Sequence, residues 1–231
     1  MADITSSTND GWIFKSATTS WSDVRDASTG ASSGRTSTNN FRGAAAEYAS
    51  GRFGATFTIV RSFFEFDTSG ISSTPTDATL KIYGRSTFGT TGTVIVVKGS
   101  QDGTLSTNDY DALDFSTAYS AEYTTTWNTS GYNNITLNST ALGDIASEST
   151  FKVALINHDF DYNNSAPGLG TIRRTGMRYV EDTTAGSDPT LSVTEASAAG
   201  YGHKVFGVAA GSIGKINGVA TANIGKVNTV D

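Results

Sequence analysis

The chain has 231 residues, a formal net charge of −6 at pH 7 and no cysteine. This length allows one large domain or two small ones, and it is enough to bury a substantial core. The acidic balance argues against binding to nucleic acid or to a membrane surface, because both favour basic patches on the protein. Without cysteine, the chain forms no disulfide and offers no thiolate for catalysis or metal binding.

The beginning of the chain and its hydropathy indicate where the protein is made. Residues 1–7 have neither the basic start nor the apolar stretch of a secretory signal. No run of about 18 apolar residues, the length of a membrane span, occurs in the sequence. We therefore expect synthesis in a cytoplasm.

Segments rich in β-branched and aromatic residues predict strands along most of the first 195 residues. In 78–84, Leu80 and Ile82 alternate with other side chains at the two-residue period of a half-buried strand. One short helix is predicted over 139–148, where apolar residues recur at three- and four-residue steps. In chain order, the predicted strands are 11–15, 56–67, 78–84, 93–98, 134–138, 151–157, 171–175, 177–181 and 190–194.

Many short strands joined by Ser, Thr, Asn and Gly predict an all-β protein, a jelly-roll or immunoglobulin-like β-sandwich. This head domain is expected to span 1–197, and the long polar stretches 16–49 and 99–131 are expected to be surface loops. Alternate residues of each strand should face the core. The predicted core residues are Phe64, Phe66, Leu80, Ile82, Val94, Val96, Leu137, Val153, Leu155, Leu191 and Val193.

The remaining residues, 198–231, contain an 11-residue repeat marked by Lys204, Lys215 and Lys226. Glycines recur within each copy and argue against a helix. We therefore expect a short extended piece, a bend and a tight turn in each copy. One copy is too small to bury its apolar side chains, which predicts an arm that anchors the chain to partner chains or to copies of itself. A flexible tail is the alternative. The apolar positions are Val205, Val208, Ile213, Ile216, Val219, Ile224 and Val227.

The sequence offers little for catalysis. His158 and His203 are the only histidines, and general acid–base catalysis needs titrating groups positioned in a pocket. No serine lies in a nucleophile elbow, because the nearest approach, 30–34, lacks the strand-to-helix setting. A glycan-cleaving enzyme would need a pair of carboxylates that face one cleft, and no pattern in the sequence places such a pair. We expect a protein that is not an enzyme.

One turn has the beginning of a calcium-binding pattern. Asp159, Asp161 and Asn163 place side-chain oxygens at every second residue, as a calcium loop does. However, Asn164 stands where that loop has Gly, and Gly170 stands where it has Glu. The alternatives are a structural calcium site, the one cofactor considered, and a plain polar turn after the strand 151–157.

Aromatic residues are scattered through the predicted long loops. Trp21, Tyr48, Trp127 and Tyr132, together with Tyr110 and Tyr119, could form a platform on which sugar rings stack. The alternative is that these rings close the end of the sandwich.

Four segments resemble, in order, those of the DNRLRE-type jelly-roll domain: Asp10–Ile13, Arg61–Ile71, Asp77–Tyr83 and Asp188–Thr194. The resemblance covers about residues 10–195, and it implies a sandwich like those of carbohydrate-binding modules in cell-surface and secreted proteins. The 11-residue copies separately resemble the Lys-Val-Asn-Gly-Val-Ala repeats that close many phage structural proteins. Together the two resemblances imply a protein located on the surface of a virion.

These observations predict a non-enzymatic virion structural protein of the decoration, cement or fibre type. Its expected partners are other virion proteins and further copies of the chain, both bound through the C-terminal arm. The alternative is a carbohydrate-binding adhesion module whose partner is a glycan. The sequence does not distinguish a capsid decoration protein from a head fibre or a tail fibre.

Overall fold

The computed structural model describes residues 1–36, 43–52, 54–90 and 92–196, and the backbone of 215–216 and 219–220. The chain divides into two compact units, Met1–Glu195 and Ala196–Asp231. In the second unit, β13 (Lys215–Ile216) and β14 (Val219–Ala220) pair antiparallel. Among the described residues, no helix is long and apolar enough to cross a membrane.

The first unit is built on one large antiparallel sheet of 12 strands, so the predicted all-β class is confirmed. It also contains two short α-helices, α1 (Ser22–Arg25) and α2 (Ser139–Ser147), a 3-10 helix, η1 (Thr107–Asp109), and a π-helix, η2 (His158–Tyr162). The strands are β1 (Ala2–Thr5), β2 (Gly11–Ala17), β3 (Ser32–Gly34), β4 (Gly43–Gly51), β5 (Gly54–Asp67), β6 (Pro75–Gly89), β7 (Val94–Gly99), β8 (Leu113–Ala118), β9 (Tyr132–Thr136), β10 (Thr150–Asn157), β11 (Thr171–Met177) and β12 (Thr190–Glu195).

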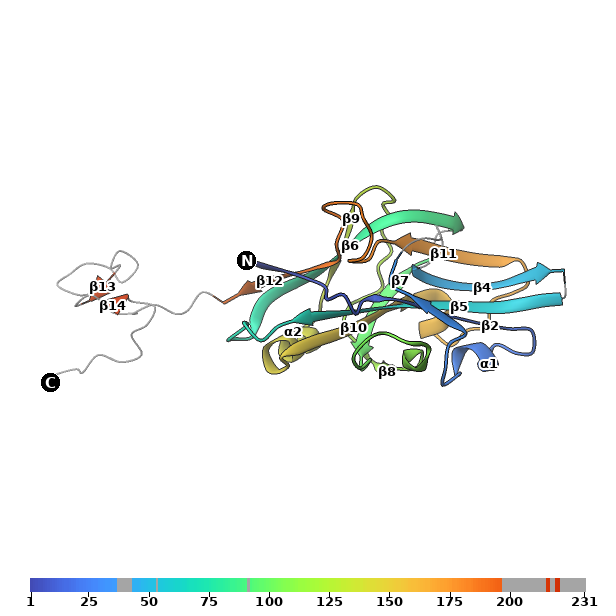
Figure 1. Cartoon of the computed structure of the whole chain (residues 1–231), viewed down its shortest axis with the longest axis horizontal. Coiled ribbons are helices and arrows are strands. Elements are labelled where there is room, and N and C mark those ends of the chain that lie inside the picture. The colour runs from blue at the N-terminus through green and yellow to red at the C-terminus, as the bar shows by residue number, and fades with distance from the viewer. Residues whose placement is uncertain (37–42, 53, 91, 197–214, 217–218, 221–231) are drawn as a thin grey trace. The chain divides into compact units, whose positions relative to one another are not determined.

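The long strands β5 and β6 each pair with three other strands of the sheet. Along its main path the strand order is β1-β12-β6-β11-β4-β5-β10-β7-β8. Figure 1 shows the paired strands β4 and β5 running side by side. Strand β5 pairs with β4, β10 and β2, and β3 extends the sheet from β2. Strand β6 pairs with two groups of strands. Its first part pairs with β9 and β12, and its last part pairs with β11. The β6 strand therefore links the β1-β12-β9 group to the strands around β5.

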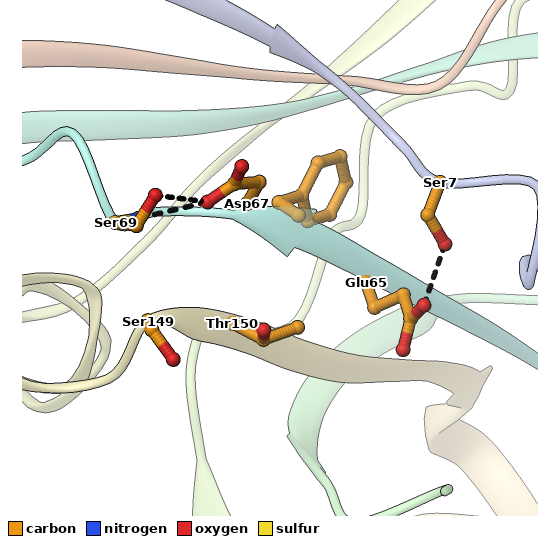
Figure 2. Close-up of a pocket in the computed structure, with 7 residues that line it drawn as sticks. Ser7, Glu65, Asp67, Ser69, Ser149 and Thr150 are labelled. Carbon is orange, nitrogen blue, oxygen red and sulfur yellow. Dashed lines mark hydrogen bonds between the residues drawn. The ribbon is translucent and has the colours of Figure 1, made fainter. Parts of the chain in front are cut away.

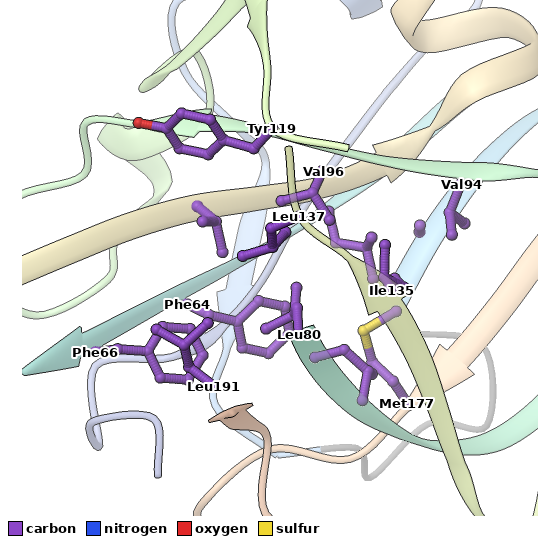
Figure 3. Packing of buried hydrophobic residues seen from close by; sticks show 14 of the residues in the cluster. Phe64, Phe66, Leu80, Val94, Val96, Tyr119, Ile135, Leu137, Met177 and Leu191 are labelled. Carbon is purple, nitrogen blue, oxygen red and sulfur yellow. The ribbon is translucent and has the colours of Figure 1, made fainter. Parts of the chain in front are cut away.

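The predicted core is confirmed. All of its members are buried in one hydrophobic cluster, in which Phe64 and Phe66 of β5 gather with Leu80 of β6 and Leu191 of β12 (Figure 3). The helix α2 also lies where the sequence predicts it. The Asn138 side chain caps α2 by accepting a hydrogen bond from the backbone N–H of Ala141.

A second hydrophobic cluster lies on the opposite face of the central strands. Phe63 and Phe64 are consecutive residues of β5, so their side chains point to opposite faces, and yet both are fully buried. The second face is covered by Trp21, Val24, Leu105 and Tyr110 and their neighbours. The central strands are therefore enclosed on both sides.

Several details differ from the expectation. Stretches 16–49 and 99–131 are not only surface loops, because they contain β4 and β8 and supply the cover of the second cluster. Their few apolar residues are too irregularly spaced to reveal this in the sequence. The predicted strand 177–181 is wrong, since β11 ends at Met177 and a turn follows, in which the Asp182 N–H donates to the Tyr179 carbonyl oxygen.

Candidate functional site

The turn that carried the calcium prediction is the π-helix η2, which directly follows β10. The Asn157 side chain caps it by accepting a hydrogen bond from the Phe160 N–H at 2.9 Å. The Asp159 carboxylate accepts hydrogen bonds from the hydroxyl of Thr93 at 2.6 Å and from its backbone N–H at 3.3 Å. This carboxylate therefore joins η2 to the chain just before β7.

The Asp161 carboxylate has a different partner, the guanidinium of Arg61 on β5. Both side chains are fully buried, and the pair is bidentate, with Nε donating to Oδ2 at 2.9 Å and Nη2 to Oδ1 at 2.8 Å. Other Arg61 donors reach the carbonyl oxygens of Tyr110 at 2.9 Å and Arg25 at 2.8 Å. Burial is the largest influence on the pKa of Arg61 and lowers it, but the charge of Asp161, its hydrogen bonds and the neighbouring acidic groups together outweigh burial, so the pKa lies above its usual value.

The three residues of the predicted calcium loop are thus not brought together as ligands of one cation. Asp161 is the counter-ion of a buried arginine, and an ion could bind it only by breaking that pair. Asn163 ends η2 through its backbone N–H, which donates to the His158 carbonyl oxygen at 3.3 Å. The structure favours the polar-turn alternative for this loop, with Asp161 as its buried anchor.

The predicted sugar-stacking residues are also separated, and two of them are core residues. Trp21 is 8% exposed in the second cluster and donates from Nε1 to the Asn164 side chain at 3.2 Å. Trp127 is 4% exposed in the first cluster and donates to the Gly176 carbonyl oxygen at 3.1 Å. Tyr110 and Tyr119 are fully buried. These four rings are buried within the two hydrophobic clusters and present no face to a ligand.

The other two rings keep part of their surface, at different places on the sheet. Tyr48 of β4 stacks on Phe57 of β5, with ring centroids 3.9 Å apart. Tyr132 of β9 packs edge-on against Tyr83 and lines a hollow of about 330 Å³, together with Asp3, Lys81, Asn134 and Thr190. Of the predicted glycan-binding residues, Tyr132 is the one that lines a described hollow.

A second hollow, of about 380 Å³, lies where β5 ends beside β10 (Figure 2). Glu65 accepts hydrogen bonds there from the side chains of Ser7 at 2.7 Å and Asn9 at 2.6 Å. Asp67 accepts from the Ser69 hydroxyl at 2.5 Å and backbone N–H at 3.0 Å, and these bonds lower its pKa. Glycoside hydrolysis needs one carboxyl that stays protonated, which requires a raised pKa. Because the pKa of Asp67 is lowered, Asp67 does not suit this acid role.

Sequence reasoning missed this hollow because its lining is assembled from three distant segments. Ser7 precedes β2, and Glu65 and Asp67 end β5. Ser149 lies just before β10, which Thr150 begins. The two-residue spacing of Glu65 and Asp67 was the only local signal. The pairing of β5 with β10 decides which other residues join them.

Most of the predicted anchoring residues, Val205, Val208, Ile213, Ile224 and Val227, lie outside the described residues. Of the second repeat copy, the backbone of two short segments is described. Ile216 in β13 is paired with Val219 in β14, and Lys215 is paired with Ala220.

Comparison with known proteins leaves the two resemblances as predictions. No family model matches the sequence, and a search of curated proteins gives no match either.

Proposed function

We propose that the protein is a non-enzymatic structural protein of a virion, of the decoration, cement or fibre type. In this proposal Met1–Glu195 is a jelly-roll head, and the C-terminal repeats are the arm that anchors it to other virion proteins or to further copies of the chain. The virion is then its location.

The observation that carries the proposal is the 11-residue repeat marked by Lys204, Lys215 and Lys226. A unit of this size cannot bury its own Val and Ile residues, so a conserved spacing of those residues within one chain favours packing against other chains. The repeats belong to a compact unit of their own, Ala196–Asp231, which supports the assignment of a separate arm.

The proposal of a jelly roll rests on the arrangement of the sheet. The long β6 joins a β1-β12-β9 group to the strands around β5, and the first hydrophobic cluster contains residues of both groups. A core shared between two groups of antiparallel strands is what a sandwich requires.

Removal of residues 203–231 is expected to leave a folded head that no longer attaches. The truncated protein should keep its β circular-dichroism spectrum and its cooperative unfolding, while its copy number in purified particles should fall to background. Self-association of the full chain, measured by light scattering, should be lost as well, because the apolar residues that need partners are gone.

Two full-length variants sharpen this test. Ile216→Ser with Val219→Ser removes apolar positions of one copy and should weaken attachment, whereas Lys215→Gln keeps them and should attach normally. Incorporation of the truncated protein at normal copy number would refute the role of the arm.

The second candidate function, a carbohydrate-binding adhesion module, is favoured by the hollow at Tyr132. A partly exposed ring beside Asn134, Lys81 and Thr190 offers both a stacking face and hydrogen-bonding groups for sugar hydroxyls. Individual sites of this kind are weak, and many copies on one particle would raise the overall affinity.

A glycan array probed with the multimerised head tests this second function. Reproducible binding that is lost in Tyr132→Ala, and retained in the control Tyr48→Ala, would support an adhesin that uses this hollow. No signal on the array, together with particles that lose heat resistance when the protein is absent, would favour a cement protein.

A further inference from the structure

Three side chains with metal-binding atoms meet at the beginning of β7, outside both hollows. Glu122, His158 and Asp159 each offer one ligand atom, and these atoms all lie within 4.8 Å of one another. Glu122 comes from the segment between β8 and β9, whereas His158 and Asp159 begin η2. The cluster is therefore created by the fold and has no sequence motif.

Backbone hydrogen bonds hold both segments against the same short stretch of chain. The Tyr123 N–H donates to the Val94 carbonyl oxygen at 2.8 Å, which fixes the position next to Glu122. The His158 N–H donates to the Thr93 carbonyl oxygen at 2.9 Å. The ligand-bearing residues are thus positioned from opposite sides of residues 93–94.

Neighbouring groups hold the three side chains in place. The His158 Nδ1 lies 3.3 Å from a Glu122 carboxylate oxygen, and the imidazole stacks on the Tyr162 ring at a centroid distance of 5.4 Å. The Thr93 hydroxyl donates to Asp159 at 2.6 Å and fixes that carboxylate from behind, as outer-shell partners do. The exposed fractions of the His158, Glu122 and Asp159 side chains are 19%, 36% and 30%, so an ion can reach them from solvent.

We propose that Glu122, His158 and Asp159 form a binding site for a divalent transition-metal ion of the zinc class. Ligand bonds of about 2.0–2.2 Å in a tetrahedral arrangement place neighbouring ligand atoms about 3.4 Å apart. The His158 and Glu122 atoms are 3.3 Å apart, and the Asp159 atom lies within 4.8 Å of both. One imidazole nitrogen with two carboxylates suits zinc, whereas calcium takes six to eight oxygen ligands. The fourth position is left to water.

The neighbouring charges set the strength of this site. Arg173 Nε lies 4.0 Å from Asp159, and it competes with the ion for that carboxylate. Two carboxylates and one imidazole nitrogen donor nevertheless leave a net negative set of ligands. A bound ion would crosslink the 120–123 segment to η2 and stabilise the head, because it binds the folded chain and not the unfolded one.

Titration of the full-length protein with ZnCl₂, followed by calorimetry and by NMR of the imidazole nitrogens, tests this site. The chain has two histidines and no cysteine, so the His158 signals can be compared directly with those of His203. We expect one Zn²⁺ per chain, a shift of the His158 signals without a shift of the His203 signals, and a rise in Tm. CaCl₂ at the same concentration should produce none of these changes.

Variants identify the ligands. His158→Gln should abolish the binding, and Glu122→Gln, which keeps the size of the side chain, should weaken it by about tenfold or more, a loss that even outer-shell changes can cause. The exposed control Asp77→Asn and the variant His203→Gln should bind as the natural chain does. Unchanged affinity in Glu122→Gln or in His158→Gln would overturn the proposal. An equal response to Ca²⁺ would do so too.

Discussion

Arg61→Met is expected to lower the free energy of unfolding by about 3–5 kcal/mol, the cost of leaving one charge of a buried ion pair without its partner. The variant leaves the fully buried Asp161 carboxylate without the two charged hydrogen bonds that it receives from Arg61. Arg25 Nε remains 3.9 Å from Asp161 Oδ1, too far for a hydrogen bond. The variant also removes the donors to the Tyr110 and Arg25 carbonyl oxygens. Urea unfolding at neutral pH measures this loss.

Two further variants show that the loss comes from the unpaired charge. In Arg61→Met with Asp161→Leu, both charges are gone, and much of the stability should return because apolar side chains can replace a buried pair. Lys81→Met breaks the partly exposed pair with Asp3 and should cost less than about 1 kcal/mol. An Arg61→Met variant no less stable than Lys81→Met would show that the buried pair contributes nothing.

The second large effect concerns Asp10, which lies just before β2 and is fully buried. Burial is the main reason that its pKa is raised to about 8, and the neighbouring Glu181 carboxylate raises it further, while a hydrogen bond from the Val180 N–H acts in the opposite direction. One Glu181 carboxylate oxygen, Oε2, is buried without a hydrogen-bond donor. A protonated Asp10 could supply that donor.

Stability is therefore expected to fall as the pH rises from about 4 to about 8. The unfolded chain releases the Asp10 proton near its ordinary pKa of 3.8, whereas the folded chain holds it until about 8. Between these values the folded state binds more protons, so each rise in pH favours unfolding, by up to about 1.4 kcal/mol per pH unit. Above pH 8 the Asp10 contribution becomes constant.

Asp10→Asn is expected to remove this dependence, because an amide can donate to Glu181 at every pH. At pH 9 the variant should be more stable than the natural chain by about 2 kcal/mol or more, and the difference should shrink toward pH 4. The exposed control Asp77→Asn should give a curve parallel to that of the natural chain. If Asp10→Asn also ran parallel between pH 4 and pH 9, the raised pKa of Asp10 would be refuted.

Local sequence patterns were sufficient for the strands with strong hydrophobic periodicity. The alternation in β6 and the apolar run of β7 predicted both strands, and the predicted core members are all buried. Apolar side chains on one face of a strand are buried whichever strands it pairs with, so their burial depends little on the order of the strands in the sheet. By contrast, the alanines of β4, which are buried on both faces of the sheet, carry too weak a hydrophobic signal to mark a strand.

The candidate sites depended on tertiary structure. The sequence singles out Asp161 and Arg61 separately, but these residues lie 100 positions apart, and only the packing of η2 against β5 makes the acid a counter-ion and removes it from calcium binding. Trp21 and Trp127 likewise become core residues because the packing of distant segments buries them, Trp21 in the second hydrophobic cluster and Trp127 in the first. Glu122 joins His158 because both segments bond to residues 93–94.

The sequence by itself determined the all-β class, the main core, the short helix and the 11-residue repeat. Each of these appears in the sequence as a regular spacing of apolar residues, and that spacing shows which side chains are to be buried away from water. Tertiary structure alone decided which polar and aromatic groups meet. The free energy of a charge or a ring depends on the partners and the solvent around it, and those come from segments that are distant along the chain.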